Sequence, residues 1–163
     1  MVELSLVGVR VELPSNTPIV LLKEKDGERF LPIFIGAVEA TAIAFALQGV
    51  VTARPMTHDL MKSLIDEVGI SLEQIAITEL RGGTFYALIN LVHNGSRFEV
   101  SARPSDAIAL AVRTGVPIYA DEEVLTEASI MIREEDDEDG DPEATVEEFR
   151  RFLEKVNPED FQG

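Results

Sequence analysis

With 163 residues, 45% of them hydrophobic, the chain is long enough for one domain with a substantial core. It contains no cysteine, which excludes disulfides and thiolate metal sites and is typical of a cytoplasmic protein. The formal net charge of −16 excludes a broad basic surface of the kind that binds nucleic acid non-specifically. No stretch approaches the ~20 apolar residues that span a bilayer, so we expect no membrane association.

The first half of the chain predicts a group of strands followed by two helices. Alternating or continuous apolar runs that end at Pro, Gly or Asn predict strands over 3–13, 19–22 and 29–35. Helical spacing of apolar residues, with a glycine at each end point, predicts helices over 37–48 and 57–68. The first helix is alanine-rich and apolar nearly all round, so we expect it to be largely buried.

The second half repeats this order. Strands are predicted over 75–81, 85–92, 97–102 and 117–120, and helices over 105–113 and 121–128. Gly82-Gly83 and Asn94-Gly95 predict tight hairpin turns. We therefore expect an α+β fold, an antiparallel or mixed sheet with alanine-rich helices packed on it. Because each half runs from hairpins into an alanine-rich helix, the pattern suggests an internal duplication.

The last fifth of the chain differs in composition. Residues 133–163 hold 4 Lys and Arg against 13 Asp and Glu, which is −9 of the total charge of −16. We expect a main domain over 1–132, an acidic flexible linker over 133–142 and an amphipathic helix over 143–157. Phe149 and Phe152 lie on the apolar stripe of that helix and need a surface to cover. With the flat faces of the alanine-rich helices, they predict a homodimer.

A motif of arginine, proline, a hydroxyl residue and aspartate occurs twice, as RPMTHD over 54–59 and as RPSD over 103–106. In one interpretation, Thr57 and Ser105 cap helices whose first turns hold Asp59 and Asp106. Capping does not explain the arginines. In the second interpretation, Arg54 and Arg103 converge and bind a phosphate that the two helix starts also attract. The sequence alone leaves both open.

His58 and Glu39 are the other candidate site residues. Histidine titrates near neutral pH and serves as an acid, a base or a metal ligand, although a hydrogen-bonded structural role is equally common. Together with Asp59 and Asp106, His58 would offer an oxygen-rich site suited to Mg²⁺ or Mn²⁺. Glu39 is the one charged residue of the first helix. We expect it to pair with Arg54 or Arg103, or to supply a third carboxylate.

Four segments resemble the bifunctional nuclease domain family: LPIFIGAVEATAIA (31–44), RPMTHDL (54–60), GGTFYALI (82–89) and ARPSDAIALAVR (102–113). The resemblance covers residues 1 to about 130, and the acidic extension resembles that of actinobacterial relatives. It implies hydrolysis of phosphodiester bonds in DNA and RNA. The positions it implicates are Glu39, Arg54, Thr57, His58, Asp59, Arg103, Ser105 and Asp106. One departure is Ser101, where many relatives have an aspartate, and a metal site that needs that carboxylate would be weakened.

From these residues we expect Arg54 and Arg103, with Thr57 and Ser105, to hold a phosphate. Asp59, Asp106 and Glu39 would hold one Mg²⁺ or Mn²⁺ ion that activates water, and His58 would transfer the proton. A different class of function also fits the acidic composition. In that alternative, the domain is a non-enzymatic regulatory module that binds an anionic ligand or a protein partner.

Overall fold

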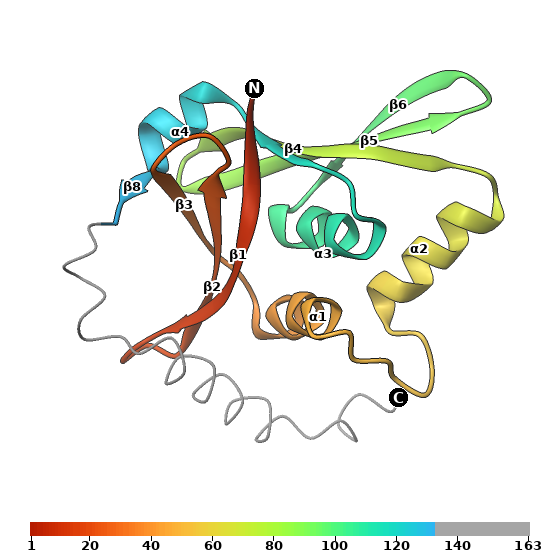
Figure 1. Ribbon diagram of the computed structural model, residues 1–163, viewed down its shortest axis with the longest axis horizontal. Helices are drawn as coiled ribbons and strands as arrows, with labels where there is room; N and C mark the ends of the chain where they lie inside the picture. The colour runs from red at the N-terminus through yellow and green to blue at the C-terminus, as the bar shows by residue number, and fades with distance from the viewer. Residues whose placement is uncertain (133–163) are drawn as a thin grey trace.

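Eight strands form one mixed sheet in the computed structural model, which describes residues 1–132 (Figure 1). The strands are β1 (Val2–Glu12), β2 (Thr17–Glu24), β3 (Arg29–Phe34), β4 (Ser71–Arg81), β5 (Thr84–His93), β6 (Ser96–Ala102), β7 (Ile118–Ala120) and β8 (Ile130–Met131). The helices are α1 (Ala37–Leu47), α2 (Thr57–Glu67), α3 (Pro104–Thr114) and α4 (Glu122–Ala128). The predicted α+β class is therefore confirmed.

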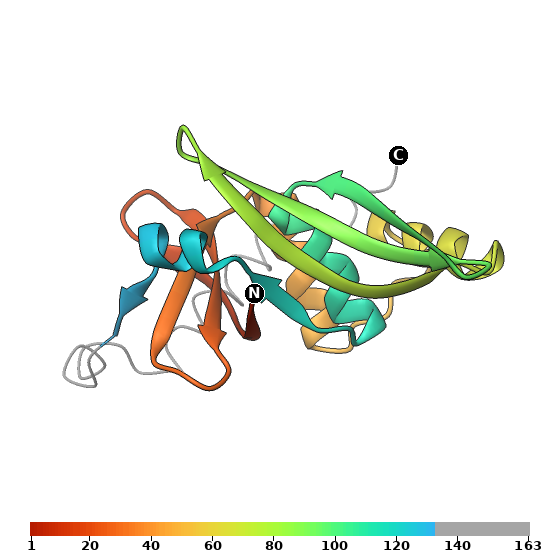
Figure 2. The same cartoon turned by 90° about the horizontal axis from the view of Figure 1, so that it is seen from above.

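The sheet order is β6-β5-β4-β7-β1-β2-β3-β8. Each half is a three-stranded antiparallel meander followed by a helix, β1–β2–β3–α1 and β4–β5–β6–α3, which agrees with the suggested duplication. The short strand β7 joins the halves, because it pairs parallel with β4 and antiparallel with β1. Figure 1 shows α1 and α3 side by side in the angle between the two halves. The long β4–β5 hairpin crosses above them in Figure 2.

The two predicted tight turns have the backbone that two-residue hairpins require. Gly82 and Gly83 have φ of 57° and 77°, and Asn94 and Gly95 have φ of 49° and 78°. Two consecutive positive φ angles define the turn whose twist matches that of the flanking strands. The turns fix the pairing of β4 with β5 and of β5 with β6. As a result Gly83 and Thr84 lie at one end of the β4–β5 hairpin.

Small side chains let α1 and α3 approach each other in the core. The buried residues of α1 are Ala40–Ala44, and those of α3 include Ala107–Ala111. The expectation that α1 is largely buried holds for its centre only, since Val38 and Leu47 near its ends are exposed. In α2, His58 is the one buried residue.

Several boundaries differ from those predicted. β4 begins at Ser71, four residues before the predicted start, and the two-residue β8 was not predicted because so short a run has no period. The predicted linker over 133–142 and helix over 143–157 lie outside the described residues. Within residues 1–132, no helix has the length and apolarity needed to cross a membrane.

Candidate functional site

The N-terminal ends of α1, α2 and α3 are joined by one network of charged and polar side chains. Nη2 of Arg103 lies 2.7 Å from Oε1 of Glu39 in α1. The same guanidinium donates from Nε and Nη2 to the two carboxylate oxygens of Asp106, at 2.8 and 3.1 Å. Nε2 of His58 in α2 is 2.9 Å from Oδ1 of Asp106. Two residues from each Arg-Pro motif region thus meet, and the predicted pairing of Glu39 with Arg103 is confirmed.

Arg103 is held on one edge and open on the other. The Nε and Nη2 groups are engaged by carboxylates, whereas Nη1 makes no hydrogen bond within residues 1–132. The side chain is 65% exposed. A guanidinium oriented in this way keeps two N–H donors directed at solvent, which suits a phosphate oxygen.

Glu39 reaches back over the start of its own helix. A Cβ atom at Gly36, the residue before α1, would lie 2.2 Å from Oε2 of Glu39. Gly36 therefore leaves the space that this carboxylate occupies. Oε2 makes no hydrogen bond within the described part of the chain, while Oε1 contacts Arg103. One oxygen of Glu39 is thus available as an acceptor.

Asp106 is the centre of the network. Its partial burial acts to raise its pKa, but the hydrogen bonds from Arg103 and His58 outweigh burial and hold the pKa below its ordinary value. The carboxylate is therefore ionised across the neutral range. His58 is only 5% exposed. Its place in the network makes it a partner of Asp106 rather than a group open to a ligand.

Asp59 belongs to a separate contact. Its Oδ1 accepts a hydrogen bond from Nε of Arg113 at 2.6 Å, and its Oδ2 accepts one from the backbone N–H of Met56 at 3.0 Å. Burial acts to raise the pKa of Asp59, and these two bonds together lower it below its ordinary value. Arg113 also donates to the carbonyl oxygens of Ala42 and Ala109, so it links α1, α2 and α3.

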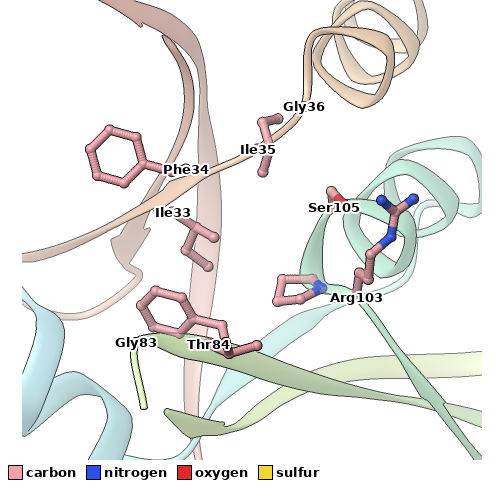
Figure 3. Close-up of a pocket in the computed structure, with 10 residues that line it drawn as sticks. Ile33, Phe34, Ile35, Gly36, Gly83, Thr84, Arg103 and Ser105 are labelled. Atoms are coloured by element: carbon pink, nitrogen blue, oxygen red, sulfur yellow. The ribbon is translucent and has the colours of Figure 1, made fainter. Parts of the chain in front are cut away.

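A pocket of about 390 Å³ opens beside this network (Figure 3). Ile33 and Ile35 come from the end of β3 and the residues after it, Gly83 and Thr84 from the β4–β5 turn, and Arg103 and Ser105 from the start of α3 (Figure 3). The complete lining is Ile33, Phe34, Ile35, Gly36, Gly83, Thr84, Phe85, Arg103, Pro104 and Ser105. Three of the four segments that carry the family resemblance therefore line one pocket, and His58 connects the fourth to it.

The capping expectation is wrong for both hydroxyl residues. The residue that caps α3 is Arg103, with Pro104 at the first position, and Ser105 is buried in the first turn. The cap of α2 is Met56, and Thr57 is its first, exposed residue. Proline explains the shift, because its fixed φ and missing N–H suit the first helical position. The aspartates do lie in the first turns as predicted.

Arg54 does not join the network. It is exposed and makes no side-chain hydrogen bond or ion pair within residues 1–132, and it does not line the pocket. The two helix starts converge through His58 and Asp106, as expected. A shared phosphate site formed by both arginines stays a prediction.

The carboxylates do not fit the expected metal site as they are arranged. Residues 1–132 contain no group of three or more His, Cys, Asp or Glu side chains placed to hold a metal ion. Arginines occupy the positions beside the acids, Arg103 between Glu39 and Asp106 and Arg113 beside Asp59. Guanidinium groups thus supply the countercharge that the sequence had led us to assign to Mg²⁺ or Mn²⁺.

The lowered pKa of Asp106 predicts an acid-dependent loss of stability. Because the pKa is lower in the folded state, the stabilisation is complete above the ordinary value of about 4 and is lost as pH falls through the folded value. We expect the free energy of unfolding, measured with urea between about pH 6 and pH 3, to fall less steeply in Asp106→Asn than in the unmodified protein. Asp26→Asn, in an exposed turn, is the control. Identical slopes for all three proteins would contradict the assignment.

Sequence reasoning missed Gly36, Arg113 and the pocket walls. Arg113 lies in an otherwise apolar helix, the same signal that singled out Glu39. Gly36 was read only as the end of a strand, and Gly83 only as a turn. Their role in the pocket depends on how the two halves of the sheet close on each other.

Comparison with known proteins places the chain in a family. The model of the bifunctional nuclease domain matches residues 20–133. Two Mycobacterium tuberculosis proteins, both named as uncharacterized, are 48% identical over 166 residues, covering 100% of this chain and 99% of theirs. Bifunctional nuclease 2 of Oryza sativa subsp. japonica is 30% identical over 115 residues, which is 68% of this chain and 35% of that protein. Bifunctional nuclease 1 of Arabidopsis thaliana is 30% identical over 105 residues, 62% of this chain and 32% of that protein.

The chain thus spans about a third of these plant relatives and nearly all of the mycobacterial ones. The matched range includes every pocket residue from Ile33 to Ser105. Since the family model matches more than half of the chain, the protein belongs to the bifunctional nuclease domain family.

Proposed function

We propose that the protein is a nuclease that hydrolyses phosphodiester bonds of DNA and RNA with little sequence preference. The observation that carries the proposal is the pocket beside Arg103, which gathers three of the segments shared with proteins named as bifunctional nucleases. The whole activity of those longer plant proteins is not assumed. Only the part that this chain matches is compared.

Arg103 is the phosphate-binding group in this proposal. Its Nε and Nη2 edge rests on Asp106 and Glu39, so its orientation is set before a substrate arrives. Its free Nη1 edge would donate to a non-bridging phosphate oxygen and offset the charge that develops there in the transition state. The first-turn N–H groups of α3 add a partial positive charge at the same point.

Glu39 and Asp106 are the candidate proton acceptors. Glu39 has one oxygen without a partner in the described chain, beside Gly36 at the pocket wall, so we assign it to accept the proton of the attacking water. Asp106 has both oxygens engaged and is assigned to position Arg103. His58, buried behind Asp106, is assigned to position that carboxylate in turn.

The charge of the protein shapes its binding. With a formal net charge of −16, long-range attraction to nucleic acid is absent, and contact relies on local cations such as Arg103 and the exposed Arg54. We expect binding to be weak and to weaken further with salt, because few phosphates are neutralised.

The proposal is tested by incubating purified protein with plasmid DNA and with RNA in Mg²⁺, Mn²⁺ or EDTA. Cleavage of either polymer supports it, and the EDTA arm decides whether a divalent ion takes part. No step proposed here passes through a metal, so cleavage in EDTA would agree with the arginine-centred arrangement. Absence of cleavage under all three conditions would favour the regulatory module, in which Arg103 binds an anionic ligand without chemistry.

We further propose that the protein forms a homodimer through α2. Leu60, Leu64 and Val68 follow at intervals of four residues and are 51%, 57% and 56% exposed. A row of this kind is self-complementary when two copies of the helix cross on a two-fold axis. We expect light scattering at tens of micromolar to give twice the 17.9 kDa chain mass, and Leu60→Glu with Leu64→Glu to give a monomer. A monomeric unmodified protein would contradict this interface.

A further inference from the structure

Phosphate binding leaves most of the pocket beside Arg103 unexplained. A phosphate needs only the open edge of Arg103 and the N–H groups near it. The remaining walls are apolar and come from three separate segments, namely Ile33 and Ile35, Phe85, and Pro104. Polar side chains are confined to Thr84, Arg103 and Ser105. An apolar slot with one anion-binding edge indicates a ligand that has a flat apolar body attached to an anionic group.

We propose that this pocket holds one unstacked nucleobase of the substrate while the adjoining phosphate lies at Arg103. The inference rests on the proposed nuclease function and names its substrate class, a single-stranded nucleic acid. The volume of about 390 Å³ lies at the small end of ligand pockets, whose range is roughly 300–1,000 Å³, and is suited to a single nucleotide. The base lies between the aliphatic side of the pocket and Phe85.

Phe34 is not the stacking ring. In Figure 3 its side chain points away from Ile33 and from Arg103, as expected for neighbouring residues on a strand. Phe85 is half-buried and lines the pocket, so its ring is anchored in the protein. Stacking on an aromatic ring tolerates any base, which agrees with low sequence preference.

Single-strand selectivity follows from this arrangement. Both faces of a base are covered by its neighbours in a duplex, so a base enters the slot only after leaving the stack. An unpaired strand has little stacking to give up. The protein should therefore cleave a single-stranded oligonucleotide faster than the same sequence in a duplex.

Binding is tested first, independently of cleavage. The full chain is titrated with thymidine 5′-monophosphate, with thymidine and with inorganic phosphate, and the NMR signals of the Ile33 and Ile35 methyl groups and the Phe85 amide are followed. Thymidine and its monophosphate are expected to shift all three signals, and inorganic phosphate to leave the methyl groups unchanged. Thymidine that shifts none of them would overturn the proposal.

A pocket-filling variant supplies the second test. Thr84 is exposed at the rim, so Thr84→Trp blocks the slot without removing a contact and is expected to weaken thymidine monophosphate binding roughly tenfold or more, the scale of one base stack. Ser96→Trp, exposed on β6 and outside the pocket, is the matched control and should bind normally. Unchanged binding by Thr84→Trp would also overturn the proposal.

Cleavage assays separate this inference from the proposed function. If the protein cleaves nucleic acid but treats single and double strands alike, and Thr84→Trp is fully active, the base pocket is wrong and the nuclease stands. If thymidine binds as described but no polymer is cleaved, the base pocket stands and the nuclease is wrong.

Discussion

Arg103→Met is expected to lower kcat/KM for cleavage of a single-stranded oligonucleotide about 100- to 1,000-fold, the usual effect of removing one preorganised donor from a developing oxyanion. Methionine keeps much of the aliphatic length but removes the open Nη1 edge. It also leaves Glu39 and Asp106 without the cation that lies between them. Because Arg103 is 65% exposed, its loss should affect cleavage far more than folding.

Arg97→Met is the control for this experiment. Arg97 is exposed on β6 and its nearest acidic partner is Glu73 at 3.7 Å, so its removal takes away the same charge far from the pocket beside Arg103. We expect this variant to keep the kcat/KM of the unmodified protein within a few-fold. Equal losses in the two variants would mean that Arg103 contributes only general charge.

Arg113→Met is expected to lower the free energy of unfolding by about 2–4 kcal/mol, as is usual for a partly buried, hydrogen-bonded charge pair that loses one member. The guanidinium is 8% exposed and bonds to Asp59, Ala42 and Ala109. Its removal leaves the Asp59 carboxylate without a countercharge and takes away the one side chain that ties α1, α2 and α3 together at this point. Urea unfolding measures the change.

Arg10→Met serves as the comparison for Arg113→Met. Arg10 is exposed on β1 and has no ion-pair partner within residues 1–132, so we expect its loss to change stability by less than about 0.5 kcal/mol. An effect of Arg113→Met as small as that of Arg10→Met would show that Asp59 finds solvent an equal partner. The site assignment of Asp59 would then be open again.

Local sequence signals predicted most of the fold. Hairpin turns at Gly82-Gly83 and Asn94-Gly95 and the alanine-rich segments determined the strands and helices of both halves, because each signal acts over a few residues. The pairing of Glu39 with Arg103 was also accessible, since a charge in an apolar helix requires a partner. The meeting of the two motif regions followed from their similarity, and His58 and Asp106 bear it out.

The rest depended on long-range packing. Nothing local indicates that Arg113 reaches Asp59, because the contact arises where the end of α3 passes the start of α2. The walls of the pocket come from β3 and β5, which lie far apart in the sheet order and face each other only because the sheet bends around α3. The metal expectation failed to fit for the same reason, as the arginines that lie among the acids are brought there by the fold.

The most direct test of the account is single-turnover cleavage of one end-labelled single-stranded oligonucleotide by the unmodified protein and by Asp106→Asn, purified in parallel. Asparagine keeps the shape of Asp106 but removes the charge that orients Arg103. We predict that the unmodified protein cleaves and that Asp106→Asn cleaves at least about 100-fold more slowly, while thymidine monophosphate still shifts the Ile33 and Ile35 signals. Equal cleavage rates for the two proteins would contradict the assignment of this network as the catalytic site.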